Sequence, residues 1–272
     1  MVIVCNGMIR SGSTLQYNIV RCLHTSLNLE LQLLGALEIG EETYQRLADA
    51  ARSPTRFLIK THRTRPAVLK LAEKGLIFVL YIYRDLRDVA VSYREKFEAP
   101  WEEILATLDE EVALYWHLKP LQGRGKVLWQ RYEEVIEDLP QAVRETAVYL
   151  GLDADESVVQ EVAEACSLQS ALRVMLQVRR EILRKAREHF STPISTRAIK
   201  KLIEESLGIA VGDPVSLIHW DHISSHRGRP GVWKEKLSAQ EVQELTSRYR
   251  DWFLDAGYRI ARSDGSPLRP SK

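Results

Sequence analysis

The chain has 272 residues, with 38 basic and 37 acidic side chains and a net charge of +1. A chain of this length supplies a sizeable hydrophobic core, which excludes wholesale disorder, and its balanced charge excludes a globally basic protein that binds nucleic acid or an anionic membrane. Any anion must be held by a local cluster of residues, which favours a small anionic ligand.

Short apolar runs predict buried parallel strands at residues 2–5, 57–60, 76–83 and 126–132. Helix-length segments follow at 14–27, 41–52, 66–74, 86–97, 139–150, 155–165, 168–189 and 238–256. The alternation predicts an α/β fold: a central parallel sheet like that of P-loop NTPases, flanked by helices, with a helix-rich C-terminal half. We predict one domain over 1–262 and a flexible tail over 263–272. Gly and Pro interrupt 190–230, and we expect the loops that select a substrate at 30–45, 97–120 and 170–225.

The first predicted strand leads into Gly7 and then Arg10-Ser11-Gly12-Ser13-Thr14, where a helix begins. Glycines let backbone N–H groups approach an anion, and the helix N-terminus adds about half a positive charge. The G-x-x-x-x-G spacing matches that of P-loop proteins, but Ser13 stands where their lysine holds the β- and γ-phosphates. The loop therefore suits a less charged group than a triphosphate, although a ligand-free strand-to-helix turn is the alternative for this segment alone.

The second predicted strand ends at Lys60 and His62, where active sites of parallel sheets collect. Imidazole has a pKa near neutrality, so His62 can remove a proton from a hydroxyl. A structural or solvated histidine is the ordinary alternative.

The third predicted strand ends at Arg84, and Ser92 follows two helical turns later. Eight residues return a side chain to nearly the same helix face, so the two can contact one phosphate. Arginine supplies a bidentate donor and serine a hydroxyl. The alternative is that Arg84 and Arg87 form surface ion pairs with neighbouring aspartates.

Taken in order, these segments resemble the sulfotransferases that use 3′-phosphoadenosine 5′-phosphosulfate (PAPS). Residues 10–14 are similar to the 5′-phosphosulfate loop, with Arg10 at the position of the lysine usual in cytosolic members. Residues 84–92 resemble the 3′-phosphate motif R-[ND]-x-x-D-x-x-x-S, and 60–66 resemble the segment K-T-H-x-x-P. The resemblance implies that His62 is the general base and that Lys60 contacts the transferred sulfuryl group.

Three further segments carry a weaker resemblance. Tyr132 resembles the tyrosine of a Y-E-D segment that packs beside adenine, and 166–168 resemble a Thr-Ser-Phe segment that contacts the same base. Arg227 and Gly228 match the Lys-Gly of R-K-G-x-x-G-D-W-K, which closes over the 3′-phosphate, whereas His226 and Val232 depart from that pattern. We predict a position in the core, and not in the acceptor pocket, for the side chains of Trp101, Trp116, Trp129 and Trp220.

The resemblance implies in-line transfer of a sulfuryl group from PAPS to a hydroxyl, less favourably an amine, of a small-molecule acceptor, releasing 3′,5′-adenosine bisphosphate (PAP) without a metal. Two alternatives stay open. A P-loop nucleotide or small-molecule kinase shares the fold and predicts Mg²⁺-dependent ATP binding. A PAPS-binding protein without catalysis would leave Lys60 and His62 dispensable.

The three cysteines, Cys5, Cys22 and Cys166, are too scattered for a disulfide framework or a paired metal motif. The N-terminal residues MVIVCNG show neither a basic leader nor an apolar segment of membrane length. We therefore expect reduced thiols, no metal and a cytoplasmic protein, and the oligomeric state is left open.

Overall fold

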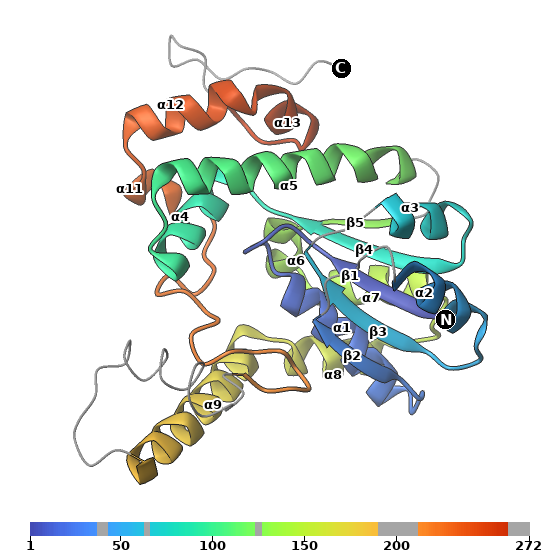
Figure 1. Ribbon diagram of the computed structural model, residues 1–272. Coiled ribbons are helices and arrows are strands. Elements are labelled where there is room, and N and C mark those ends of the chain that lie inside the picture. The colour runs from blue at the N-terminus through green and yellow to red at the C-terminus, as the bar shows by residue number, and fades with distance from the viewer. Residues whose placement is uncertain (37–42, 63–65, 123–126, 190–211, 261–272) are drawn as a thin grey trace.

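A computed structural model describes residues 1–36, 43–62, 66–122, 127–189 and 212–260. It contains one sheet of five parallel strands in the order β2-β3-β1-β4-β5 (Figure 1). The strands are β1 (Val2–Asn6), β2 (Gln32–Ala36), β3 (Phe57–Thr61), β4 (Ile77–Tyr83) and β5 (Val127–Arg131). The predicted α/β class with a central parallel sheet is confirmed.

Helices flank this sheet, and they account for most of the described residues after β5. They are α1 (Ser13–Ser26), α2 (Thr43–Arg52), α3 (Pro66–Glu73), α4 (Leu86–Phe97), α5 (Trp101–Gln122), α6 (Tyr132–Glu137), α7 (Leu139–Leu150), α8 (Glu156–Ala165), α9 (Leu168–His189), α11 (Trp233–Lys236), α12 (Ala239–Arg248) and α13 (Arg250–Asp255). The helix-rich C-terminal half is therefore confirmed. The predicted segment 238–256 is two helices, because the chain leaves helical geometry at Tyr249, where φ is −111°.

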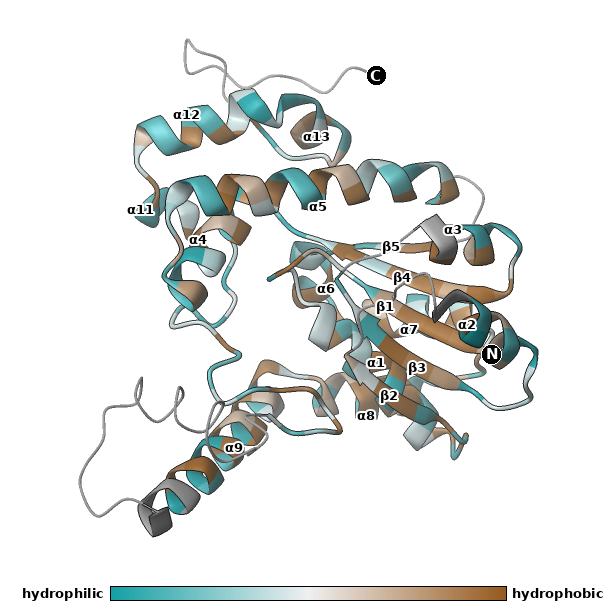
Figure 2. Cartoon of the chain, viewed as in Figure 1, coloured by the Kyte–Doolittle hydropathy of each residue, from teal (hydrophilic) through white to brown (hydrophobic). Residues whose placement is uncertain are grey.

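The central strand β1 is buried along its whole length and pairs with β3 and β4. Val4 faces the helices α2, α3 and α5, whereas Ile3 faces α1 and α7 on the opposite side. Because both faces are covered, the strand is a continuous apolar run, which explains why periodicity predicts it. Figure 2 shows the same hydrophobic character along the inner strands of the sheet.

Strand β2 is a correction to the predicted loop over 30–45. It lies at the sheet edge beside β3, its side chains alternate between exposed and half-buried, and Leu34 is exposed. Its register with β3 shifts between Leu33 and Gly35, where Gly35 has a φ of 72°. An edge strand lacks the continuous apolar run of a central strand. Its signal is the alternation of Leu29, Leu31 and Leu33 with polar residues, which the loop prediction overlooked.

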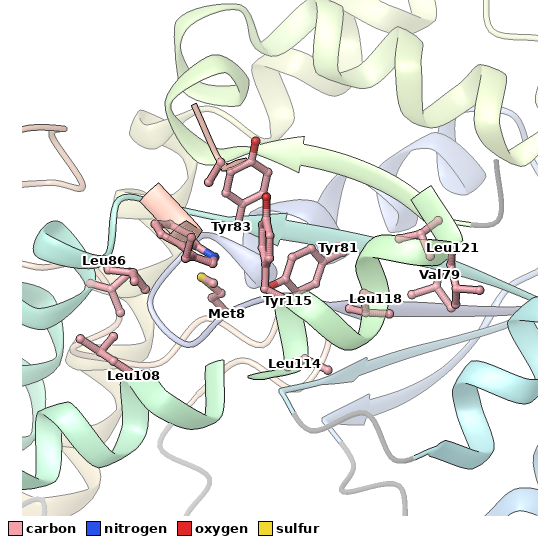
Figure 3. Packing of buried hydrophobic residues seen from close by; sticks show 14 of the residues in the cluster. Met8, Val79, Tyr81, Tyr83, Leu86, Leu108, Leu114, Tyr115, Leu118 and Leu121 are labelled. Atoms are coloured by element: carbon pink, nitrogen blue, oxygen red, sulfur yellow. The ribbon is translucent and has the colours of Figure 1, made fainter. Parts of the chain in front are cut away.

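Helix α5 is a correction to the predicted loop over 97–120. It covers one face of the sheet, where its Tyr115 ring lies 5.7 Å from that of Tyr83 on β4 (Figure 3). Its buried residues Ile104, Leu108, Leu114 and Leu118 have helical spacing. That spacing is present in the sequence and indicates a helix, so the prediction of a loop was wrong.

The four tryptophans that were predicted to lie in the core have different environments. Trp101 and Trp129 pack against the core, as predicted, whereas Trp116 is 41% exposed on α5.

Two segments with sequence-based predictions lie outside the described residues. They are 190–211, which is part of the stretch 190–230 that Gly and Pro interrupt, and the predicted flexible tail 263–272. Among the described helices, none combines the length and the apolar character needed to cross a bilayer.

Candidate active site

A cavity of about 730 Å³ lies at the carboxyl ends of the central strands. Its lining includes nearly all the predicted site residues: Arg10, Gly12, Ser13, Thr14, Lys60, His62, Arg84, Ser92, Tyr132, Arg227 and Gly228. The fold thus brings segments that are far apart in the sequence to one space. The exception is Ser11, which is buried beside the cavity but does not line it.

Ser11 shapes the loop between β1 and α1. Its hydroxyl oxygen lies 2.5 Å from the carbonyl oxygen of Met8 and 3.0 Å from that of Ile82, so its single proton is shared between them and links the loop to β4. Gly12, at φ 95°, is the N-cap of α1 and provides no side-chain cap. The N–H groups of the first helical turn are therefore left for an anion, which is the arrangement of a phosphate-binding loop.

The side chain of Tyr132 lies so close to two positions of the backbone that only glycine fits there. A Cβ atom at Gly12 would lie 2.8 Å from Cδ2 of Tyr132, and one at Gly228 would lie 2.2 Å from its hydroxyl oxygen. The Tyr132 hydroxyl also donates to the Gly228 carbonyl at 2.9 Å. The ring therefore packs between the loop after β1 and the segment at 227–229, and both approaches require a residue without a side chain.

Arg84 joins the same segments. Its guanidinium is buried, lies 4.5 Å above the Tyr132 ring, and donates to the carbonyl oxygens of Gly228 and Arg229 at 3.3 and 3.2 Å. Its Nε is also buried and has no hydrogen-bond partner among the described residues. A buried charged donor without a partner is costly, and an anion would satisfy it.

Asp88, one turn into α4, holds the segment beyond Gly228. Its carboxylate accepts hydrogen bonds from the N–H groups of Gly231 and Trp233 at 2.7 and 3.0 Å. Arg87 stacks its guanidinium 4.0 Å above the Trp233 ring. Helix α4 therefore fixes the backbone of 231–233.

His226 also contacts α4. It forms a hydrogen bond with Glu95 at 2.8 Å and does not line the cavity.

Arg10 crosses the cavity from the loop after β1. Its Nε donates to the Ser92 hydroxyl at 3.0 Å, and a terminal nitrogen donates to the carbonyl oxygen of His222 at 3.2 Å. Burial and the nearby charge of Arg84 lower the pKa of Arg10. Concentrated positive charge in a buried site favours an anionic ligand.

Lys60 and His62 form a polar pair at the end of β3. The Lys60 Nζ lies 3.2 Å from His62 Nε2, and His62 Nδ1 lies 3.0 Å from the carbonyl oxygen of Gly7. A carbonyl only accepts, so Nδ1 carries the proton and Nε2 keeps a lone pair. Burial first, then the charge of Lys60, lowers the pKa of His62 to about 4, and burial lowers that of Lys60 to about 8.

The predicted substrate-selecting loop 170–225 contains the segment 212–224, but the sequence did not indicate which of its side chains face the cavity. The structure shows that Ser216 and residues 218–224 line it. The His219 and His222 rings stack there with centroids 5.8 Å apart, and Asp221 pairs with Lys96 of α4. Trp220 is buried, as predicted, but it also lines the cavity, which the prediction did not include. The only signal was the broken periodicity of 190–230, which indicates a functional loop but not which side chains face the ligand.

A parallel sheet with an uncapped helix N-terminus and buried arginines at its carboxyl edge defines a protein that transfers or binds an anionic group. The family model of the sulfotransferase domain matches residues 3–193. The chain therefore belongs to the sulfotransferase family, and its class of activity is the transfer of a sulfuryl group.

Solved structures agree on the fold. Mouse sulfotransferase SULT7A1, complexed with PAP, is 17% identical; the match covers 92% of this chain and 85% of that one, with a TM-score of 0.59. Retinol dehydratase with androsterone and the inactive cofactor PAP is 16% identical, covering 97% and 82%, with a TM-score of 0.56. Its complex with retinol and PAP is 17% identical, covering 93% and 80%, with a TM-score of 0.57. The comparison with curated proteins found no match.

Proposed function

We propose that this sulfotransferase takes its sulfuryl group from PAPS, passes it to the hydroxyl of a small-molecule acceptor, and uses His62 as the general base. The observation that carries the proposal is the meeting of three parts in one cavity: the uncapped start of α1, the Arg84 and Ser92 pair, and the Lys60 and His62 pair. The solved neighbours complexed with PAP support this choice of donor.

The cavity residues fit a nucleotide with two separate anionic ends. The loop at 10–14 would hold the 5′-phosphosulfate through backbone N–H groups, and Arg84 with Ser92 would hold the 3′-phosphate. The unpartnered Nε of Arg84 supports this second contact. Tyr132, which packs between Gly12 and Gly228, would flank the adenine, and the backbone around Arg227 would close over it.

The proposed chemistry depends on the protonation states of Lys60 and His62 at the end of β3. His62 Nε2, neutral because of the lowered pKa, would accept the proton of the acceptor hydroxyl as that oxygen attacks sulfur. PAPS, when bound, supplies an activated sulfuryl group. The Lys60 ammonium and the Arg10 guanidinium would stabilise the negative charge left on the departing phosphate, so positioning and electrostatics account for most of the rate enhancement.

Two measurements test the proposal against its alternatives. We expect calorimetry to show tight binding of PAP and much weaker binding of ATP with Mg²⁺, because Ser13 replaces the lysine that a triphosphate needs. We also expect label from ³⁵S-PAPS to appear on acceptors in a panel of phenols and aliphatic alcohols. Tighter binding of ATP, or transfer of ³²P from ATP to the same panel, would overturn the proposal in favour of a kinase.

A further inference from the structure

His222 is a second histidine of the cavity, to which the proposed transfer assigns no role. It ends a turn in the segment 212–224, where its N–H donates to the carbonyl oxygen of His219 at 3.1 Å. His222 is half-buried and lines the same cavity as Lys60 and His62. A half-buried residue that lines a cavity presents part of its surface to a molecule bound there.

Three contacts fix the position of His222. The Arg10 guanidinium donates to its backbone carbonyl oxygen at 3.2 Å. The preceding residue, Asp221, forms an ion pair with Lys96 of α4. The His222 ring stacks on that of His219, with centroids 5.8 Å apart and an angle of 14° between the planes. Because Arg10 belongs to the loop proposed to hold the 5′-phosphosulfate, His222 lies beside the end of the donor that carries the sulfuryl group.

The ring nitrogens of His222 make no hydrogen bond to any part of the chain that the structure describes. Its polar neighbours in the cavity are engaged. Arg10 donates to the Ser92 hydroxyl, and His62 contacts Lys60 with one ring nitrogen and a backbone carbonyl with the other. A polar ring that lines a cavity without a partner can serve a ligand in that cavity.

The charge state of His222 suits an uncharged ligand group. Burial first, then the charges of Arg10 and Lys60, lower the pKa of His222 to about 3, so the ring is neutral near pH 7. A neutral imidazole has one N–H donor and one acceptor nitrogen, and both can bond a hydroxyl. Phosphate and sulfate form stronger hydrogen bonds with cations, and the cavity supplies these as Arg10, Lys60 and Arg84.

We propose that His222 binds the acceptor hydroxyl and holds it between His62 and the sulfuryl group. This role rests on the proposed function, because it assumes transfer at this end of the cavity. A hydroxyl oxygen has one proton and two lone pairs. The proton points to His62 Nε2, one lone pair faces sulfur, and the His222 N–H donates to the other. His222 forms no covalent bond and exchanges no proton, so it contributes by orienting the nucleophile.

The first test compares His222→Phe with His222→Asn. Phenylalanine keeps a flat ring without an N–H, so kcat/KM for the acceptor should fall by about 3- to 10-fold, the effect of one hydrogen bond between uncharged groups. Asparagine keeps a side-chain N–H and should recover most of this loss. The acceptor is the panel compound that takes up most label from ³⁵S-PAPS. His117→Phe, at an exposed position on α5, is the control and should behave like wild type.

PAP affinity, measured by calorimetry, separates an acceptor contact from a donor contact. It should be the same in wild type, His222→Phe and His222→Asn. A loss of PAP affinity as large as the loss of kcat/KM would assign the ring to the nucleotide and overturn the proposal, as would a wild-type kcat/KM in His222→Phe. Circular dichroism melts check folding, and His222→Leu, which also lacks an N–H, replaces the phenylalanine variant if that one does not fold.

The second test measures binding without transfer. In equilibrium dialysis, wild type should bind 4-methylphenol more tightly than toluene, which lacks the hydroxyl, and His222→Phe should reduce this preference. His219→Phe keeps the stacked ring and should reduce it less. An equal effect of the two variants would show that packing of the turn matters and not the hydrogen bond, which would overturn the proposal.

Dialysis with and without PAP distinguishes failure of this inference from failure of the proposed function. If PAP does not bind, the proposed donor is wrong, while the preference for 4-methylphenol in the nucleotide-free protein still tests the contact with His222. If PAP binds and the preference is the same in wild type and His222→Phe, the donor stands and the contact with the acceptor hydroxyl is wrong.

Discussion

The Arg10 guanidinium donates from Nε to the hydroxyl of Ser92 at 3.0 Å, although the two residues are 82 positions apart. Arg10 belongs to the loop assigned to the 5′-phosphosulfate and Ser92 to the contact assigned to the 3′-phosphate. One hydrogen bond therefore spans the two ends of the proposed donor site. Phosphate groups bound at these ends would compete with it and take over both donors.

Arg84→Gln should weaken PAP binding by about 10- to 150-fold, because a hydrogen bond to a charged group contributes about 1.5–3 kcal/mol. Binding of adenosine 5′-phosphate, which lacks the 3′-phosphate, should change little, and calorimetry measures both. Arg94→Gln is the control, since that arginine pairs with Glu241 outside the cavity. Equal weakening of both nucleotides would show that Arg84 is structural.

Gly228→Ala and Gly231→Ala separate backbone strain from steric clash. The two glycines have φ values of 74° and 78°, so alanine costs about 1–2 kcal/mol of strain at either position. Only at Gly228 would the new methyl meet the Tyr132 hydroxyl, whereas Gly231 has open space. PAP affinity, measured by calorimetry, should therefore fall much further for Gly228→Ala.

Adding Tyr132→Phe to Gly228→Ala should restore part of that affinity, because it removes the oxygen that the methyl meets. A double variant that binds PAP more weakly than Gly228→Ala would argue that the Tyr132 hydroxyl matters more than the steric fit.

His62→Ala should lower kcat by about 10²- to 10⁴-fold with PAP binding nearly unchanged, as expected for loss of a general base. Because the pKa of His62 is lowered to about 4, the base stays neutral, and the acid limb of kcat/KM in wild type should lie near pH 4 instead of 6.5. His117→Ala, an exposed site on α5, is the control. Turnover of His62→Ala within a few-fold of wild type would rule out the role.

Binding of PAP at pH 8 should take up protons through Lys60. Its pKa in the free protein is about 8, so the amine is partly neutral there, and the negative charge of PAP favours the ammonium and raises that pKa. Calorimetry in two buffers of different ionisation enthalpy measures the uptake. It should vanish in Lys60→Met and at pH 6.5, where wild-type Lys60 is already charged, and equal heats in both buffers at pH 8 would contradict it.

The sequence predicted those parts of the fold that are set by local pattern. β1, β3 and β4 are buried on both faces, so their apolar residues alone indicate them. The edge strand β2 pairs with β3 on one side only, and its local signal is the weaker alternation of leucines with polar residues over 27–33. The motif residues converge on the cavity as the resemblance implied, except that Ser11 bonds to backbone and not to the cavity. Roles that stand on the resemblance alone stay predictions.

The sequence indicated a functional loop around 212–224 but not which of its side chains face the cavity, for a physical reason. Its position depends on contacts over long sequence separations, such as the hydrogen bond from Arg10 to the His222 carbonyl oxygen and that from Asn18 to the Ser216 carbonyl oxygen. Periodicity describes neighbours within a few residues, so it cannot place a loop that is held by side chains of a distant helix.

Asp88 accepts hydrogen bonds from the N–H groups of Gly231 and Trp233, which lie 143 and 145 positions later in the chain. A contact that closes so long a loop forms late in folding, since its entropy must be overcome before any stabilisation is gained. The nucleotide cavity should therefore be completed after the sheet and be the first part to open. In native-state hydrogen exchange, the Trp233 amide should exchange through a local opening, while the amide of Val4 exchanges only when the whole domain unfolds.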